Sequence, residues 1–190
     1  MISDKVKTDP RIGEGLDFSV TEAYNLLRTN LEFSIPDKQP GKARIIGSTS
    51  ACPQEGKSYT SANLAYSFAR NGAKVLLIDA DMRRPTLASK LDLPISPGLS
   101  NLLAGHGTPA IRHGVLHENL SVLTAGDTPP NPSELLGSDR MKELLDGFGG
   151  EYDLILIDLP PVNSVPDPVI VSRMTDGIIL VVRHGSSRKR

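Results

Sequence analysis

The sequence predicts an α/β fold with a mostly parallel central sheet and helices on both faces. Segments that are apolar throughout alternate with segments of helical periodicity, which is typical of parallel strands covered on both sides. One apolar segment runs into a Gly-Lys-Ser triplet, and two others end in aspartate, at Asp79 and Asp158. Because ligands bind outside the carboxyl ends of the strands in an open parallel sheet, these endings predict a single binding edge.

The composition favours one folded domain. The chain has 190 residues, of which 38% are apolar and 23% are charged, as in a globular protein with one core. The formal net charge of −1 argues against nucleic-acid binding over the whole surface. No apolar run approaches the roughly 20 residues that cross a bilayer, and the start lacks a signal-peptide core. With Cys52 as its one cysteine, the chain is expected in the cytoplasm, reaching the inner face of the membrane only through a partner.

The N-terminal segment, residues 1–41, is predicted to hold an amphipathic helix and a linker ahead of the main domain at 42–190. The helix is expected over "SVTEAYNLLRTNLEF" (19–33), where Ser19 and Glu22 have the spacing of a capping box. The breaker-rich "SIPDKQPGK" then marks the linker. Two roles stay open for the helix, packing on the core and self-association. Four residues at helical spacing predict its apolar face: Val20, Ala23, Leu27 and Leu31.

The main domain is predicted to begin with a strand, a loop and a helix. The strand is expected in "ARIIGSTS" (43–50) and the helix at 57–70. A strand in "AKVLLIDAD" (73–81), a short helix in "GLSNLLAG" (98–105) and a strand in "NLSVLTAG" (119–126) follow. The helix at 57–70 is predicted to turn four residues toward the core: Ala62, Ala65, Phe68 and Ala69.

The second half of the domain continues the alternation. A single helix is expected over residues 131–148, with Asn131 as N-cap, Pro132 at the first helical position and Glu134 three residues after the cap. A strand in "YDLILIDLPP" (152–161), a short helix at 167–174 and a last strand in "DGIILVVR" (176–183) complete it.

The stretch "SACPQEGKSYTSANLA" (50–65) predicts the phosphate-binding loop of a P-loop NTPase. The motif requires a glycine, four free positions and then Gly-Lys-Ser/Thr, and Ala51 stands at the first glycine. That position accepts alanine where its backbone angles allow, whereas Gly56 would lie against the phosphates. The helix that starts there favours an anion, Lys57 would reach the β- and γ-phosphates, and Ser58 would ligate magnesium. The residues expected at the nucleotide are Ala51, Cys52, Pro53, Gln54, Glu55, Gly56, Lys57, Ser58 and Tyr59.

Acidic residues end two of the predicted strands. Asp79 and Asp81 stand in "VLLIDADMRRP", and Asp158 stands in "LILIDLPP". An apolar strand that ends in aspartate beside a phosphate loop usually holds Mg²⁺, often through water. The alternative is that each aspartate caps the next helix or starts a turn. Three such residues after a glycine-lysine loop favour the magnesium interpretation.

Taken together, "TSACPQEGKSYTSANLA", "VLLIDADMRRP" and "LILIDLPP" resemble the bacterial tyrosine kinases of capsule and exopolysaccharide synthesis. The resemblance covers about residues 19–185. Members of that family often have Ala or Ser at the first loop position and Pro two residues later, as Ala51 and Pro53 are here. The related partition and septum-placing ATPases usually carry a second lysine where this chain has Cys52, so the kinase branch is favoured.

The resemblance implies an ATP-dependent protein tyrosine kinase, an autokinase, with ATP and Mg²⁺ at the site. Lys57 would neutralise the β- and γ-phosphates, while Ser58, Asp81 and Asp158 would surround the metal. Asp79 resembles the proposed base that accepts the proton of the attacking tyrosine hydroxyl. The implied catalytic set is therefore Lys57, Asp79 and Asp81. Two interpretations stay open for the arginines at 83 and 84: phosphate or phosphotyrosine binding, and a solvated pair.

The resemblance also implies partners. These are protein tyrosine substrates and a membrane-spanning modulator on a separate chain. A ring-shaped homo-oligomer is less expected, because the association motif Glu-x-x-Arg-x-x-Arg has Asn25 between Glu22 and Arg28. Leu159 replaces the threonine that usually follows the strand-ending aspartate, and metal binding is expected to persist.

Family members carry further chain after the last strand, including a tyrosine-rich tail. This sequence stops at Arg190, so we expect either an incomplete C-terminal end or a chain that does not phosphorylate itself in the usual way. Two other functions therefore stay open, a partition-type ATPase and a nucleotide-binding regulatory module with impaired catalysis. The tyrosines of the sequence are Tyr24, Tyr59, Tyr66 and Tyr152.

Overall fold

A parallel sheet forms the centre of the protein, as the sequence predicts. The computed structural model describes residues 8–35, 41–106 and 111–185. Within these ranges five parallel strands pair in the order β3-β2-β4-β1-β5. The register places the last residues of β2 and β4 side by side, so the two strand-ending aspartates are neighbours. The strands are β1 (Arg44–Ser50), β2 (Val75–Asp79), β3 (Leu120–Leu123), β4 (Leu154–Asp158) and β5 (Gly177–Val181).

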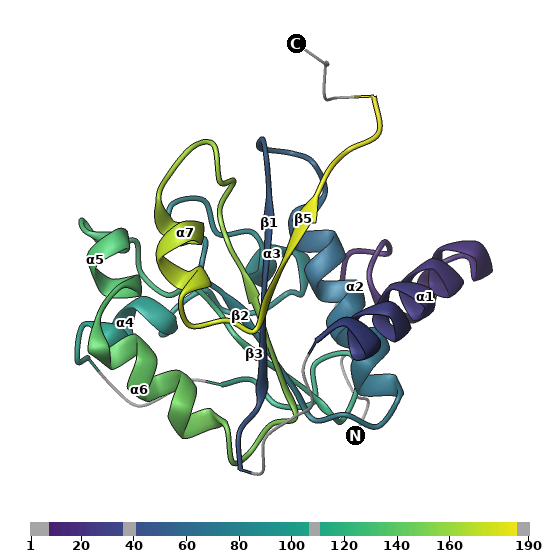
Figure 1. Cartoon of the computed structure of the whole chain (residues 1–190), viewed down its shortest axis with the longest axis horizontal. Coiled ribbons are helices and arrows are strands. Elements are labelled where there is room, and N and C mark those ends of the chain that lie inside the picture. Colours follow the sequence, from purple (N-terminus) through teal and green to yellow (C-terminus); the bar gives the residue numbers. More distant parts are fainter. Residues whose placement is uncertain (1–7, 36–40, 107–110, 186–190) are drawn as a thin grey trace.

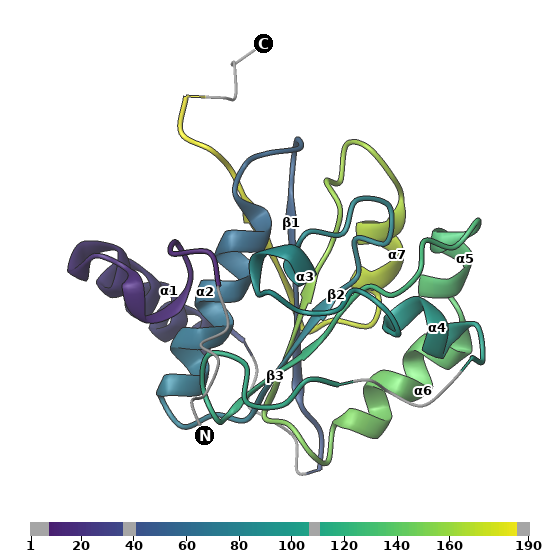
Figure 2. The same ribbon diagram turned by 180° about the vertical axis from the view of Figure 1, so that it is seen from behind.

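Helices cover both faces of this sheet (Figures 1 and 2). On one face lie α1 and α2, and on the other lie α4, α5, α6 and α7. The α-helices are α1 (Phe18–Ser34), α2 (Lys57–Arg70), α3 (Leu87–Lys90), α4 (Leu99–Leu103), α5 (Pro132–Leu136), α6 (Asp139–Phe148) and α7 (Asp167–Ser172), and a 3₁₀ turn η1 spans Gly13–Gly15.

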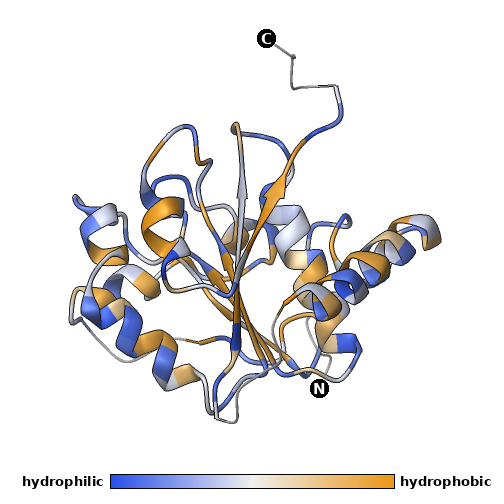
Figure 3. Ribbon diagram, viewed as in Figure 1, coloured by the Kyte–Doolittle hydropathy of each residue, from blue (hydrophilic) through white to orange (hydrophobic). Residues whose placement is uncertain are grey.

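The side chains of each central strand pack alternately into two apolar cores, one on each face of the sheet. This explains why the sequence of each strand is apolar throughout. In β2, Leu76 and Ile78 enter the core beneath α4, α5 and α6, while Val75 and Leu77 enter the core beneath α2. Figure 3 shows largely apolar strands at the centre, with helices such as α1 and α6 of mixed hydropathy beside them. At the end of the strand order, β5 departs from the pattern because alternate residues such as Leu180 are exposed.

The loop helix α2 has the predicted boundaries and the predicted core residues. It spans Lys57–Arg70, and its residues Ala62, Ala65, Phe68 and Ala69 are all buried. The prediction of one helix over 131–148 is wrong, because the chain forms α5 and then α6. The Ser138 hydroxyl accepts the Met141 amide at 3.3 Å and starts the second helix. Pro132 does open α5, but the Asn131 side chain donates to Glu134 and makes no cap hydrogen bond.

The N-terminal helix forms as predicted, but its predicted cap is wrong and only half of its predicted apolar face packs on the core. Helix α1 begins at Phe18 after Asp17, and no side chain caps it, so the predicted capping box is absent there. Val20 and Ala23 are exposed. Leu27 and Leu31 of the predicted face do pack against the core above α2, and Tyr24 and Ile35 join them there. No helix in the described ranges has the length and apolar character needed to cross a membrane.

Candidate functional site

A cavity of about 620 Å³ opens at the carboxyl ends of the strands, within the size range of small-molecule sites. It lies where the phosphate loop faces the segments that follow β2 and β4. Of the predicted nucleotide-binding residues, Ala51, Cys52 and Glu55 lie outside its lining. The predicted residues that do line it are Pro53, Gln54, Gly56, Lys57, Ser58, Tyr59 and Asp81.

The loop between β1 and α2 has the backbone shape of a strand-to-helix turn around an anion. Gly56 has φ of 93° directly before the helix, a left-handed conformation that favours glycine. Gln54 also has a positive φ, of 66°, whereas Ala51 does not, so alanine fits its position without strain. The Glu55 carboxylate accepts the Cys52 amide at 3.0 Å and closes the loop on itself.

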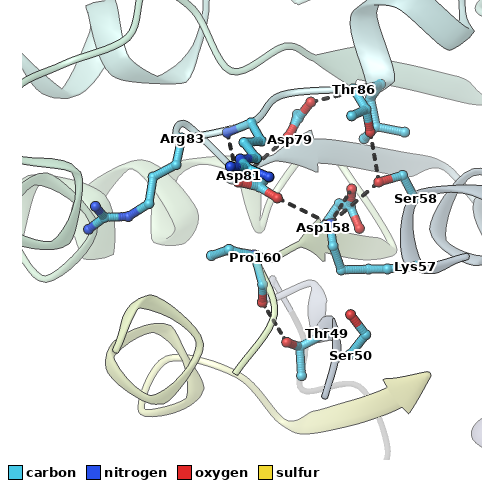
Figure 4. A network of polar contacts seen from close by, with 12 residues as sticks. Thr49, Ser50, Lys57, Ser58, Asp79, Asp81, Arg83, Thr86, Asp158 and Pro160 are labelled. Carbon is cyan, nitrogen blue, oxygen red and sulfur yellow. Dashed lines mark hydrogen bonds and ion pairs between the residues drawn. The ribbon is translucent and has the colours of Figure 1, made fainter. Parts of the chain in front are cut away.

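The lysine of the loop lies among oxygen atoms from three elements (Figure 4). The Lys57 ammonium is 3.0 Å from Asp158 Oδ2, 3.7 Å from Asp81 Oδ2 and 3.4 Å from Ser58 Oγ. All four residues are buried. The structure therefore places three predicted site residues around the ammonium of a fourth, Lys57.

Asp79 lies beneath this cluster and has no exposed surface. Its Oδ1 accepts the Asp81 amide and its Oδ2 accepts the Leu87 amide, both at 3.1 Å. Burial, and after it the neighbouring Asp158 carboxylate, raises the pKa of Asp79 to about 7. Both oxygens thus contact backbone amides, and the role of Asp79 as a base stays a prediction.

The segment after β2 is fastened by further polar contacts. The Asp81 carboxylate accepts the Arg84 amide at 3.1 Å, and burial raises the pKa of Asp81. Arg83 forms an ion pair with the buried Asp167 at 3.0 Å and donates to Ser133 at 2.9 Å. Arg83 and Arg84 are both exposed and both line the cavity, but the Arg83 guanidinium is held by Asp167 and Ser133.

The oxygen atoms around Lys57 suit a hard divalent cation such as Mg²⁺. Asp158 Oδ2 accepts no hydrogen bond in the described structure and is balanced by the Lys57 ammonium, which stands where a metal cation would. In the described ranges no three His, Cys, Asp or Glu residues gather into a metal site. Besides the Asp81 and Asp158 carboxylates, a magnesium ion here would therefore need hydroxyl oxygens and the phosphates of a nucleotide.

Sequence reasoning missed three groups of the site. Ser61 donates to Asp158 Oδ1 at 2.8 Å, a contact that its spacing of four residues from Lys57 could have indicated. The Thr86 hydroxyl lies 2.9 Å from Ser58 Oγ, and no sequence pattern indicated it. The third group surrounds Tyr59.

Tyr59 joins the N-terminal segment to the loop helix. Its hydroxyl donates to Asp9 at 2.6 Å, and the Arg11 guanidinium and Lys90 ammonium face its ring at 4.3 and 4.8 Å from the centroid. The Asn63 side chain accepts the Gly13 amide at 3.0 Å and donates to the Arg11 carbonyl at 2.9 Å. Residues 9–13 are therefore held against α2.

The departures from the family pattern also have structural reasons. Asn25 donates to Glu22 at 2.9 Å and accepts the Ser67 hydroxyl of α2 at 3.0 Å, so it serves the contact between the two helices. Arg28 pairs with Glu32 at 3.4 Å. Leu159 is fully buried in the core beneath α4 to α6, an environment in which an aliphatic side chain packs well.

Comparison with known proteins gives three findings. A family model described as an AAA domain matches residues 54–184. Tyrosine-protein kinase YwqD of Bacillus subtilis is 44% identical over 170 residues, which cover 89% of this chain and 70% of YwqD. The solved kinase domain of Escherichia coli tyrosine kinase ETK is 37% identical with a TM-score of 0.83, covering 93% of this chain and 68% of that one.

A weaker likeness extends the fold to a second group of proteins. The ATP complex of a variant of McdA from Cyanothece has a TM-score of 0.61 at 23% identity, covering 74% of this chain and 56% of McdA. At that identity the likeness concerns the fold alone.

Proposed function

The chain belongs to the bacterial tyrosine-protein kinases, and from this premise we propose that it transfers phosphoryl groups from Mg·ATP to tyrosine in the control of capsule or exopolysaccharide synthesis. The observation that supports the chemistry best is the Lys57 ammonium held by Ser58, Asp81 and Asp158 at the floor of the cavity. Phosphoryl transfer requires mainly positioning and charge neutralisation, and this cluster supplies both.

Lys57 and the loop amides are the proposed phosphate-binding groups. On nucleotide binding the ammonium would turn from the carboxylates to the β- and γ-phosphates, while the amides at the start of α2 face the same anion. Ser58, Asp81 and Asp158 would hold Mg²⁺, which would neutralise charge on the phosphates. When the Lys57 ammonium turns to the phosphates, the oxygens of Ser58, Asp81 and Asp158 would become free to bind Mg²⁺. The metal ion would then take the place that the ammonium occupies without nucleotide.

Asp79 is the proposed base, and its raised pKa of about 7 suits proton transfer near neutrality. Its carboxylate is fully buried and bound to the amides of Asp81 and Leu87. Reaching a tyrosine hydroxyl therefore requires the segment 80–86 to open. This proposal makes the movement of that segment part of the catalytic cycle.

The proposed partners follow from the family. They are protein tyrosine substrates and a membrane-spanning modulator on a separate chain, which would hold the kinase at the inner face of the membrane. A third proposed partner is a second copy of the chain. Three large apolar residues that α1 exposes support this self-association: Phe18, Leu26 and Phe33.

Incubation of the purified chain with [γ-³²P]ATP, Mg²⁺ and a tyrosine-bearing peptide tests the proposal. Phosphotyrosine on the chain or the peptide, absent when a chelator replaces Mg²⁺, is the expected result. Phosphate release without phosphotyrosine would favour a partition-type ATPase. Nucleotide binding with neither product would favour a regulatory module.

A further inference from the structure

A second hydroxyl adjoins the one that the phosphate loop supplies. Thr86 Oγ1 lies 2.9 Å from Ser58 Oγ, although the two residues belong to different elements and stand 28 positions apart. Both residues line the cavity, as does Asp81. Figure 4 shows the Thr86 hydroxyl turned toward Ser58, on the side where Lys57 and the carboxylates converge.

The Thr86 hydroxyl does not cap the helix that it precedes. Thr86 is the N-cap of α3, yet its side chain makes no cap hydrogen bond. The first amide of that helix, from Leu87, donates instead to the buried Asp79 carboxylate. The Thr86 hydroxyl is therefore not needed to begin the helix, and it turns to the site.

The oxygen atoms at the site are too few to surround a magnesium ion without this hydroxyl, water and phosphate. Mg²⁺ takes near-octahedral oxygen coordination and is usually held by one or two carboxylates with phosphates and water. The described residues bring the Asp81 and Asp158 carboxylates to the Lys57 ammonium, whereas both oxygens of the neighbouring Asp79 accept backbone amides. Hydroxyl oxygens are the remaining side-chain ligands within reach, and Ser58 and Thr86 are in direct contact.

We propose that the Thr86 hydroxyl joins Ser58 in the coordination sphere of the Mg²⁺ bound with the nucleotide, an inference that rests on the proposed function. The Asp79 carboxylate fixes the backbone on both sides of this segment, since it accepts the amides of Asp81 and Leu87. The segment that carries the Asp81 carboxylate therefore also carries the Thr86 hydroxyl. One metal ion would then fasten this segment to the start of α2.

The test is the magnesium dependence of nucleotide binding in the whole chain. A fluorescent ADP analogue at fixed concentration is titrated with Mg²⁺ against wild type, Thr86→Val, Thr86→Ala and Thr86→Ser. We expect the half-saturating Mg²⁺ concentration to rise about tenfold in the valine and alanine variants. We expect it to stay within about twofold of wild type in the serine variant, which keeps the hydroxyl. Binding of the analogue in a chelator should be the same in all four proteins.

Ser89→Ala is the matched control. It removes a hydroxyl from the same short helix, where Ser89 donates to the Thr86 carbonyl and is exposed. Its magnesium titration should coincide with that of wild type, and melting curves should show every variant folded. Because valine and alanine differ in volume, a shift common to both follows from the lost hydroxyl, and a loss of fold in one leaves the other informative.

Two failures are distinguishable. A wild-type magnesium dependence in both Thr86→Val and Thr86→Ala would overturn the assignment of Thr86 and leave the kinase proposal intact. Nucleotide binding by wild type that is indifferent to Mg²⁺ would instead contradict the metal site of the proposed function, and the role of Thr86 with it.

Discussion

The strand-end cluster and the α1–α2 contact are held together by opposite kinds of interaction. At the strand ends, Lys57 and three aspartates are buried together, and burial raises the pKa of Asp79 and of Asp81. Between α1 and α2, a neutral hydrogen bond from Ser67 to Asn25 accompanies half-buried apolar residues. No residue of α1 is fully buried.

The difference separates function from stability. Buried charges cost free energy even when paired, so the strand-end cluster contributes little to folding for the number of contacts it makes. The α1–α2 contact buries apolar area at no such cost. Substitutions in the first region should therefore change catalysis and pH dependence, whereas substitutions in the second should change the free energy of unfolding alone.

The largest expected effect is on catalysis, from Asp158→Asn. Removing this carboxylate takes away a proposed magnesium ligand and the nearest partner of Lys57, so phosphotyrosine formation should fall about 100-fold. Asp153→Asn, at the amino end of the same sheet, is the matched control because Asp153 accepts the Lys74 amide far from the cavity. Equal losses of activity in the two variants would show that catalysis does not depend specifically on the strand-end cluster.

A pH effect on stability should follow from Asp79. Its pKa is about 7 in the folded protein against an ordinary value of 3.8, so the folded state binds the extra proton between these values. The stabilisation is complete below about pH 4 and is lost as the pH rises through 7, on the order of 4 kcal/mol in all. Asp79→Asn should remove this loss. The denaturant midpoints of wild type and Asp79→Asn, determined between pH 4.5 and 8, measure this loss. If both midpoints changed with pH in the same way, Asp79 would not be the group responsible.

A smaller, pH-independent effect is expected from Leu27→Ala in α1. Leu27 packs against the core above α2, so its truncation should lower the free energy of unfolding by about 1–2 kcal/mol. Leu26→Ala is the control, since Leu26 is 63% exposed and its loss should change stability by less than about 0.5 kcal/mol. Urea unfolding of both would test whether the observed face of α1 is the one that packs.

The smallest effect is expected from Tyr59→Phe. The variant loses the hydrogen bond to Asp9 but keeps the ring that Arg11 and Lys90 face. Because Arg11 is exposed and Asp9 is only half-buried, the loss should stay below about 1 kcal/mol. A drop of several kcal/mol in urea unfolding would show that the N-terminal segment belongs to the folding core.

The two regions also differ in how far the sequence predicts them. Helix α2 has its predicted boundaries, because the Gly-Lys-Ser triplet fixes its start and the strands on either side fix its place. The face of α1 was predicted only in part, because Leu27 and Leu31 pack as expected whereas Val20 and Ala23 are exposed. The contact with α2 decides which of the apolar residues pack. Periodicity over 131–148 likewise concealed the break at Ser138, where a side-chain cap starts a new helix.

Tertiary contacts explain what the sequence concealed at the site. The aspartates at the strand ends converge because parallel strands end at one edge, which a pattern can predict. The contacts of Thr86 with Ser58 and of Tyr59 with Asp9 join distant segments. No local periodicity encodes them, so they emerge only once the segments are placed in space.

Lys57→Met tests the central claim most directly, since the Lys57 ammonium is the centre of the strand-end cluster. The methionine keeps much of the side-chain volume, and the buried carboxylates can take up protons, so the variant should fold, with a lower melting temperature. Phosphotyrosine formation with Mg·ATP is measured on the folded variant beside wild type. The account predicts that it is abolished; full activity in the purified variant would contradict it.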